Sequence, residues 1–321
     1  MTLLLVAFSF VCAVAPMATF AAIVWWLDRY DREPVGLIGL TFAWGAMGAV
    51  VLAIFGSAAA LVVLHAIFGH LPEWVGVSVV APAIEEPAKA LFLVFVVWNR
   101  AFDNTADGFV YGAVAGLGFA MTENLVYFVG ASGDPLVWGG TVVLRTFYSG
   151  LMHATATAFV GAAVGLTRFR GGPAMAAGAL AGLAVAFVIH ATWNGLIALD
   201  MRGDFPGFAV DLLLFPFELA AAFALFQFAL AHEAYSLREE LERWAARGLL
   251  PLEHLPNLVR WWGRREPGWA GACSDPDRYV AVATQLAHRS RQVRLLGSRA
   301  DAERVADLER LVGEVRGLLA A

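Results

Sequence analysis

The sequence predicts an all-α polytopic membrane protein with about seven transmembrane helices and a small helical tail in the cytoplasm. Of its 321 residues, 60% are hydrophobic and 15% are charged, and the mean hydropathy is +0.67. Soluble domains have about 45–50% apolar and about 25% charged residues. The excess of apolar residues in this chain is too large to be buried in the core of a water-soluble protein. A span needs about 20 apolar residues. The qualifying segments are 3–27, 35–69, 74–98, 108–130, 136–167, 174–199 and 208–231.

The first two segments are each expected to form one spanning helix. No Lys or Arg precedes the first, and its small-residue motif at 13–15 is followed by Pro16, a poor residue for signal-peptide cleavage. Segment 35–69 is long enough to hide a hairpin near Gly56. Two spans of about 17 residues would be marginal, which favours a single helix.

Basic loops predict the orientation in the cell membrane. Arginines occur in alternate loops, at 28–34, 99–107 and 168–172, whereas the loops at 70–73 and 131–135 contain no Lys or Arg. Short basic loops stay in the cytoplasm. Seven spans put these loops and the Arg-rich tail inside and the N-terminus outside, and an eighth would separate the first basic loop from the others.

Charge divides the chain into a membrane body, residues 1–231, and a soluble tail, residues 232–321. The body holds 8 Lys and Arg against 14 Asp and Glu, whereas the tail holds 14 against 13. Helical spacing carries the seventh span into the tail. An a/d seam shorter than three heptads then predicts a helical hairpin that serves packing or docking. The seam residues are Val305, Leu308, Val312, Val315 and Leu319.

Composition also excludes two classes of protein. A net charge of −5 without a basic run excludes a nucleic-acid-binding protein that relies on phosphate neutralisation. Two cysteines, Cys12 and Cys273, exclude a disulfide framework and a cysteine metal cluster.

Glycines four residues apart in the predicted spans indicate close helix packing. They are the pairs Gly112/Gly116, Gly161/Gly165 and Gly178/Gly182.

Ionisable residues inside the third span mark a candidate site, because burying them in lipid is costly. Glu85, Glu86 and Lys89 lie here, close to Pro82 and Pro87. Glu85 and Lys89 are four apart, in the favourable order for an ion pair, which leaves Glu86 free for other work. The prolines remove backbone donors and are expected to kink or open the helix.

Three later spans add polar side chains at membrane depth. Glu123 lies on the fourth and His153 on the fifth, while His190 and Asn194 share one face of the sixth. At 1.5 Å per residue, Glu86, Glu123 and His190 lie roughly 18, 10 and 14 Å from the outer ends of their helices. These groups are expected to meet in a water-accessible cavity in the outer half of the membrane.

Two histidines with carboxylates form the ligand set of a hydrolytic zinc, with a carboxylate left to deprotonate the water. The soluble zincin spacing H-E-x-x-H is absent, as is a G-x-S-x-G nucleophile motif. The pattern therefore predicts a hydrolase that has neither of these two motifs of soluble enzymes.

The motifs, in this order on consecutive helices, resemble the PrsW family of intramembrane proteases over about residues 1–230. The matching residues are Glu85, Glu86, Lys89, Phe119, Glu123, Asn124, His153, His190 and Asn194, with the loop 28–34. That family is distantly similar to the CAAX prenyl-protein processing proteases, which show E-E-x-x-x-R, F-x-x-x-H and H-x-x-x-N. Here Lys89 replaces the arginine at one residue shorter spacing, and Glu123 stands where they have histidine.

The resemblance implies an intramembrane endopeptidase that cleaves membrane-anchored proteins in the lipid bilayer, such as a single-pass anti-sigma factor. Glu85 or Glu86 would activate water, and Lys89 would hold Glu85. Asn194 would help to stabilise the oxyanion. The residues expected to bind zinc or orient the water are Glu123, His153 and His190.

Several alternatives stay open. A metal-free glutamate mechanism is one, and an ion- or proton-coupled transporter is another, although no convincing internal repeat is found. A catalytically inactive scaffold whose tail docks a partner is a third. Asp211 and Glu218, on one face of the seventh span, pair with Arg145 or line the cavity.

Overall fold

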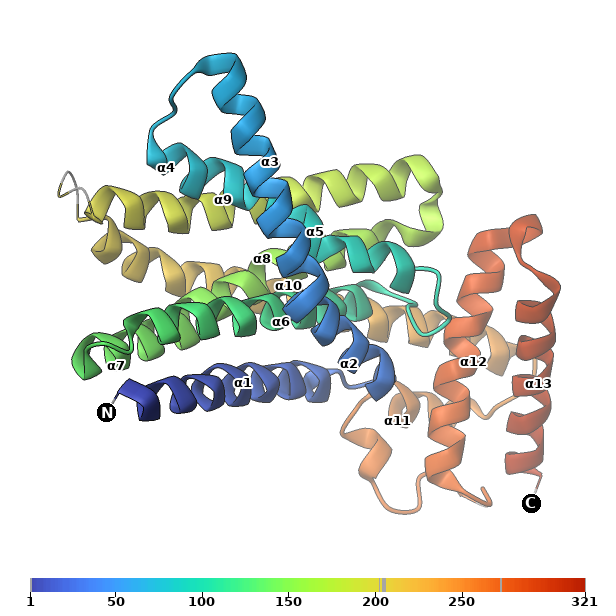
Figure 1. Cartoon of the computed structure of the whole chain (residues 1–321). Helices are drawn as coiled ribbons and strands as arrows, with labels where there is room; N and C mark the ends of the chain where they lie inside the picture. Colours follow the sequence, from blue (N-terminus) through green and yellow to red (C-terminus); the bar gives the residue numbers. More distant parts are fainter. Residues whose placement is uncertain (1, 202, 204–205, 272, 321) are drawn as a thin grey trace.

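The computed structural model describes residues 2–201, 203, 206–271 and 273–320, and all regular elements in this part of the chain are helical (Figure 1). Six of the helices are long and apolar enough to cross a membrane, which confirms an all-α polytopic fold. They are α1 (Thr2–Leu27), the continuous run of α2 (Val35–Ala43), η1 (Trp44–Ala49) and α3 (Val50–Phe68), then α6 (Thr105–Ala131), the continuous run of α7 (Pro135–Leu144), η3 (Arg145–Ser149), α8 (Gly150–Thr167) and η4 (Arg168–Arg170), and finally α9 (Gly172–Met201) and α10 (Gly207–Ala246).

The predicted third span, 74–98, differs from these six. It forms one helical run of α4 (Glu73–Val75), η2 (Gly76–Val80) and α5 (Ala81–Val96), which lies along α9 (Figure 1). Three charged residues in its centre make it too polar to count as an apolar span. The described residues therefore contain six apolar spans and one polar helical run, rather than seven equivalent spans.

Two predictions about the spans are confirmed. Helices α2, η1 and α3 form one run without a hairpin near Gly56. The loops at 28–34, 97–104 and 168–171 lie together at the end of the bundle that the tail covers (Figure 1). Arg264 of the tail donates to the Tyr30 carbonyl at 3.3 Å, and Gln292 contacts Asp103. The basic loops and the tail therefore share one side, as the predicted alternation requires.

Helix α6 and the run that contains α8 form the centre of the bundle, because 72% of the most apolar stretch of each is buried within the protein, against 17% for α1. Glycine makes this burial possible. A Cβ on Gly112 would lie 2.3 Å from the Thr157 carbonyl oxygen, and one on Gly116 would lie 2.3 Å from that of His153. The predicted close packing at all three glycine pairs is confirmed, and it brings His153 on α8 directly against α6.

The tail consists of α10 beyond the membrane and several shorter helices. These are η5 (Leu252–His254), α11 (Leu255–Val259), η6 (Gly263–Arg265), α12 (Pro276–Leu296), η7 (Gly297–Arg299) and α13 (Ala302–Leu319). Helices α12 and α13 form the predicted hairpin, which buries Leu311 and Val315 but leaves Val305 exposed. Because α10 is continuous to Ala246, the predicted boundary at residue 231 falls inside a helix.

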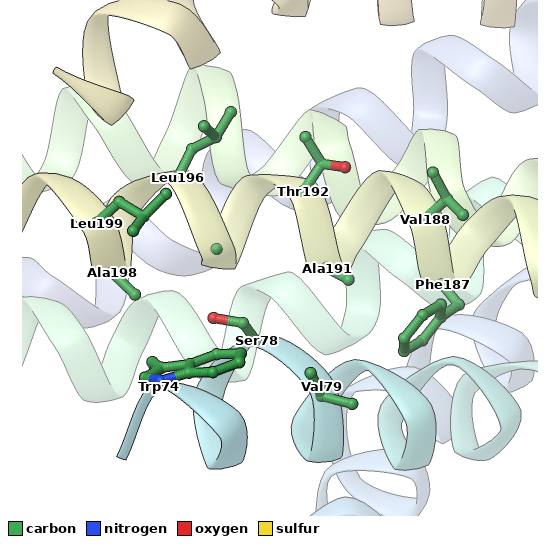
Figure 2. A pocket seen from close by; sticks show the side chains of 11 residues that line it. Trp74, Ser78, Val79, Phe187, Val188, Ala191, Thr192, Leu196, Ala198 and Leu199 are labelled. Atoms are coloured by element: carbon green, nitrogen blue, oxygen red, sulfur yellow. The ribbon is translucent and has the colours of Figure 1, made fainter. Parts of the chain in front are cut away.

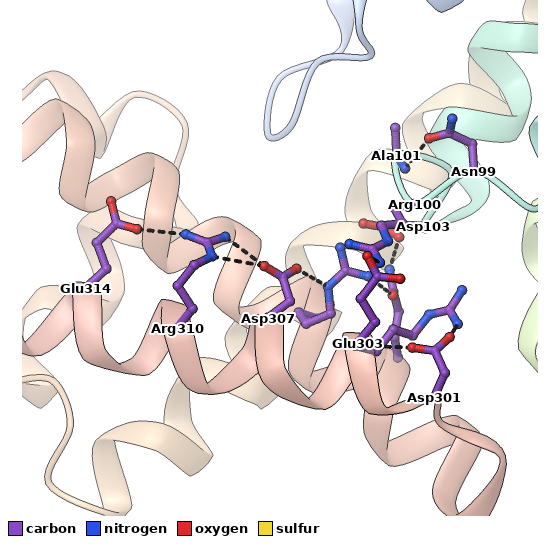
Figure 3. A network of polar contacts seen from close by, with 12 residues as sticks. Asn99, Arg100, Ala101, Asp103, Asp301, Glu303, Asp307, Arg310 and Glu314 are labelled. Carbon is purple, nitrogen blue, oxygen red and sulfur yellow. Dashed lines mark hydrogen bonds and ion pairs between the residues drawn. The ribbon is translucent and has the colours of Figure 1, made fainter.

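Ion pairs join the tail to the membrane body (Figure 3). Arg100, in the loop after α5, pairs with Glu303 at the start of α13. Arg289 of α12 then holds Asp307 of α13 at 2.9 Å, so the hairpin is tied to itself as well as to the loop. These contacts are partly exposed, and each one alone stabilises docking only slightly.

A buried histidine lies deeper in the same junction. His288 of α12 lies 3.4 Å from Glu233 of α10, and both side chains are almost fully buried. Burial by itself lowers the pKa of His288, but the contact with Glu233 and the negative charges of Asp103 and Asp31 outweigh it and raise the pKa to about 9. His288 is therefore an imidazolium at neutral pH and compensates carboxylates from three parts of the chain.

We expect docking of the tail to weaken as the pH rises. The folded pKa of His288, about 9, exceeds its ordinary value of 6.5. The stabilisation is therefore complete below pH 6.5 and is lost as the pH rises through 9, with a total of about 3 kcal/mol. Hydrogen exchange of α12 amides between pH 6 and 10, corrected for intrinsic exchange, measures this. The pH dependence should flatten in His288→Gln, and an unchanged profile in that variant would refute the assignment.

Candidate active site

A buried ion pair on α5 lies at the centre of the candidate site. Lys89 Nζ contacts Glu86 Oε1, and neither side chain is exposed. The Glu86 carboxylate also lies 2.7 Å from His190 Nδ1 and accepts a hydrogen bond from Thr157 Oγ1 at 3.3 Å. Glu86 therefore joins α5 to both α9 and α8.

This pairing corrects the prediction that Lys89 holds Glu85 and leaves Glu86 free. Lys89 pairs with Glu86 instead. Spacing alone does not choose between the two, because residues three and four apart are both neighbours on a helix. The neighbouring helices decide: Thr157 and His190 surround Glu86 with donors, while the side chain of Glu85 stays 16% exposed.

The partners of His153 fix its tautomer. Nδ1 lies 3.0 Å from Lys89 Nζ, and an ammonium only donates, so Nδ1 is the accepting nitrogen. The proton is therefore on Nε2, which donates to Glu123 Oε2 at 2.7 Å. Arg145 Nη2 lies 2.8 Å from the same carboxylate oxygen. Lys89 and Glu123 thus hold the ring of His153 from opposite sides.

His190 uses the opposite ring nitrogen as a donor. A carboxylate only accepts, so His190 Nδ1 donates to Glu86. Nε2 lies 3.7 Å from Glu85 Oε2, which is buried and has no hydrogen-bond partner among the described residues. The rings of His190 and His153 meet edge to face with centroids 4.7 Å apart. The second nitrogen of His190 and an unpartnered carboxylate oxygen of Glu85 therefore lie side by side.

These groups fit a metal ion. Donor atoms of Glu85, His153 and His190 lie within 4.8 Å of one another, close enough for one ion to bind all three. Two imidazoles and a carboxylate match the protein ligands of hydrolytic zinc sites. Glu86 accepts from Nδ1 of His190, as a carboxylate typically does from the nitrogen of a ligating histidine that does not bind the metal. Lys89 and Glu123 occupy the two nitrogens of His153, so binding through either nitrogen requires one of these contacts to break.

Six of the seven residues predicted for the site lie in this network: Glu85, Glu86, Lys89, Glu123, His153 and His190. The seventh, Asn194, lies one turn beyond His190 and donates its Nδ2 to the Val77 carbonyl at 2.9 Å. It ties α9 to the π-helical turn η2. The ligand set of Glu123, His153 and His190 stays a prediction. In the structure, the cluster of three donors contains Glu85 in place of Glu123.

Sequence reasoning did not place Arg145 in the site. The structure pairs Arg145 with Glu123 and with Asn124 Oδ1, at 3.0 Å, rather than with Asp211 or Glu218. The available signal is the arginine itself, because a cation inside a span needs a carboxylate partner. Asp211 Oδ2 and Glu218 Oε2 are buried without a hydrogen-bond partner among the described residues.

A polytopic helical bundle that packs carboxylates, imidazoles and a lysine at membrane depth belongs to the class of intramembrane enzyme scaffolds. Within that class, the chain belongs to the PrsW family: residues 33–225, more than half of the chain, match the PrsW family intramembrane metalloprotease. All residues of the network lie inside the matched region.

Two relatives agree with the family assignment. The chain is similar to "Protease PrsW" of Clostridioides difficile (strain 630), with 35% identity over 102 residues, which are 31% of this chain and 42% of the relative. It is also similar to "Protease PrsW" of Bacillus subtilis (strain 168), with 27% identity over 191 residues, 57% of this chain and 80% of that relative. The chain therefore spans less than half of the first relative and four fifths of the second. No solved structure matches the chain.

Removing Lys89 alone would leave Glu86 as an unpaired buried charge. We expect Lys89→Met to lower the free energy of unfolding by about 3–5 kcal/mol. The double variant Glu86→Gln/Lys89→Met should recover most of this loss, because it buries no charge. Reversible unfolding in detergent measures both, with Arg170→Met as a control at a basic loop. A double variant no more stable than Lys89→Met would contradict the central role of this pair.

Proposed function

We propose that the protein is an intramembrane metallopeptidase that hydrolyses a peptide bond in a membrane-anchored protein. The convergence of Glu85, His153 and His190 inside a helical bundle carries the proposal. Family membership and the two protease relatives support it.

Zinc is the metal that this donor set favours. Glu85, His153 and His190 would hold it, which replaces Glu123 in the set expected from sequence. When bound, the ion would polarise the scissile carbonyl and acidify a water molecule. Glu86 orients His190 through Nδ1, and Lys89 neutralises Glu86, so these two are positioning residues.

Glu123 is the carboxylate left to act as the base. Its side chain is 26% exposed, more than that of Glu85, and it lies 2.8 Å from Arg145 Nη2. Water attacks the scissile carbonyl carbon as Glu123 takes its proton. Glu123 then returns the proton to the leaving nitrogen as the C–N bond breaks. Arg145 stays paired with Glu123 throughout and limits the positions that its carboxylate adopts.

The ligand and base roles separate experimentally. Glu85→Gln and His190→Ala should lose both bound zinc and cleavage of a tagged single-pass reporter in proteoliposomes. Glu123→Gln should keep its zinc and lose cleavage by about 10²–10⁴-fold, because it removes only proton transfer. Elemental analysis and fragment detection measure the two properties.

Glu253→Gln, on the exposed surface of the tail, is the control and should retain both. Zinc lost in Glu123→Gln but kept in Glu85→Gln would restore the ligand set expected from sequence. Cleavage that persists in all three site variants would refute a peptidase site at this network.

We further propose that the N-terminus lies outside the cell and the tail in the cytoplasm. The three basic loops gather at the end of the bundle that the tail covers, and basic loops stay inside. The substrate class is a protein with a single span, such as an anti-sigma factor, which the family resemblance implies.

Cysteine labelling tests the orientation. In a variant with Cys12 and Cys273 replaced by serine, Gly133→Cys should react with a membrane-impermeant maleimide in intact cells. Arg170→Cys should react only after the membrane is permeabilised. The reverse pattern would invert the proposed topology.

A further inference from the structure

An apolar groove runs along the surface between the helical run α4–η2 and α9 (Figure 2). Its volume is about 670 Å³. One wall carries Trp74, Ser78 and Val79, and the facing helix contributes small residues such as Ala191 and Ala198. Trp74 and Val79 are exposed on the rim, so the groove opens sideways from the bundle.

One buried hydroxyl in this groove has no partner among the described residues. Ser78 is 5% exposed, and its Oγ makes no hydrogen bond among the described residues. Several hydroxyls in the spans donate to the carbonyl four residues earlier, as Thr41 and Thr141 do at 2.7 and 2.8 Å, but the Ser78 hydroxyl does not. In Figure 2 the Ser78 side chain lies between the two helices and faces α9 at Gly195. A buried, unsatisfied donor therefore lies in a groove whose other lining residues, except Thr192, are apolar.

The groove lies on the same two helical runs as the candidate active site. Ala191 follows His190 directly, and Asn194, between the groove residues Thr192 and Gly195, binds the Val77 carbonyl. Along the other wall, Ser78 and Glu85 are seven residues apart, which is roughly 10 Å along a helix. A chain that lay in the groove would run beside the helical turns that carry His190 and Glu85.

We propose that this groove binds the membrane-spanning segment of the protein substrate in an unwound form, and that Ser78 donates to a backbone carbonyl of that segment. The proposal rests on the proposed function. Hydrolysis needs an exposed peptide bond, and an unwound backbone in lipid carries carbonyls that lack donors. The apolar walls match the substrate's side chains and the Ser78 hydroxyl matches its backbone. An acyl chain offers no acceptor for that hydroxyl.

A second apolar groove supplies a matched control. It lies farther along α5 and α9, has a volume of about 370 Å³, and is lined by Leu91, Ala176 and Ala179 among others. It shares the helices and the apolar character of the first groove, but none of its lining residues carries a hydroxyl.

The test measures binding without cleavage. The full chain carrying Glu85→Gln is placed in phosphatidylethanolamine–phosphatidylglycerol nanodiscs. The probe is an apolar peptide of about 20 residues, with a Gly-Pro pair in its span and a benzophenone beside the pair. A second peptide has Leu-Leu in place of Gly-Pro. Cross-links are mapped by mass spectrometry, and affinity is measured by titration.

We expect the Gly-Pro peptide to cross-link to α9 around Ala198. Ala198→Trp, which fills the groove, should weaken binding at least about tenfold. Ser78→Ala should weaken it about fivefold, the effect of one neutral hydrogen bond. Ala176→Trp, in the control groove, should leave affinity unchanged. If Ala198→Trp unfolds, Ser78→Ala decides, with its thermal unfolding compared with that of the parent.

Three results would overturn the proposal: cross-links elsewhere, equal losses in both grooves, or equal binding of the Leu-Leu peptide. A benzophenone-labelled acyl lipid that labels Ala198 when the peptide does not would also overturn it and make the groove a lipid site. Groove binding without reporter cleavage by the parent chain would refute the proposed function alone. Reporter cleavage undiminished by Ala198→Trp would refute the groove alone.

Discussion

The buried pair of Lys89 and Glu86 is the interaction on which the candidate site depends. Two opposite charges without solvent access are tolerated only when their remaining hydrogen-bonding capacity is satisfied. Here His190 and Thr157 complete the shell of Glu86, while His153 and the ring of Phe119, 4.7 Å from Lys89 Nζ, complete that of Lys89. One ion pair on α5 therefore sets the positions of side chains on α6, α8 and α9.

Backbone packing is the second condition. The carbonyl of His153 would collide with any side chain at Gly116, so α6 and α8 approach closely only because glycine stands there. That approach brings Glu123 within hydrogen-bond distance of His153 Nε2. The chemistry of the site and the packing of the bundle thus depend on the same pair of helices.

The spans, the glycine contacts and most residues of the candidate site can be predicted from the sequence. Burying a charged or polar side chain in lipid is costly, so such a residue inside a span is expected to have a function. The partners within the site do not follow. The pairing of Lys89 with Glu86 depends on His190, which is more than a hundred residues away in the chain. The pairing of Arg145 with Glu123 likewise depends on how α6 meets η3. The periodicity of a sequence shows which residues share a face of one helix. It does not show which residues of other helices pack against that face.

The three π-helical turns, at η1, η2 and η3, have a consequence for how the gene tolerates change in length. A π-helical turn holds one more residue than the α-helical turn it replaces. One residue can therefore be lost inside such a turn while the α-helix beyond it keeps nearly the same phase, whereas a deletion in regular α-helix rotates everything beyond it by about 100°. Glu85 and Glu86 follow η2, and His153 follows η3. A deletion inside either turn would leave these side chains close to their positions, whereas a deletion in the first turn of α5 or α8 would turn them away from the site. The π-helical turns are therefore the places in these helices where loss of one residue disturbs the site least.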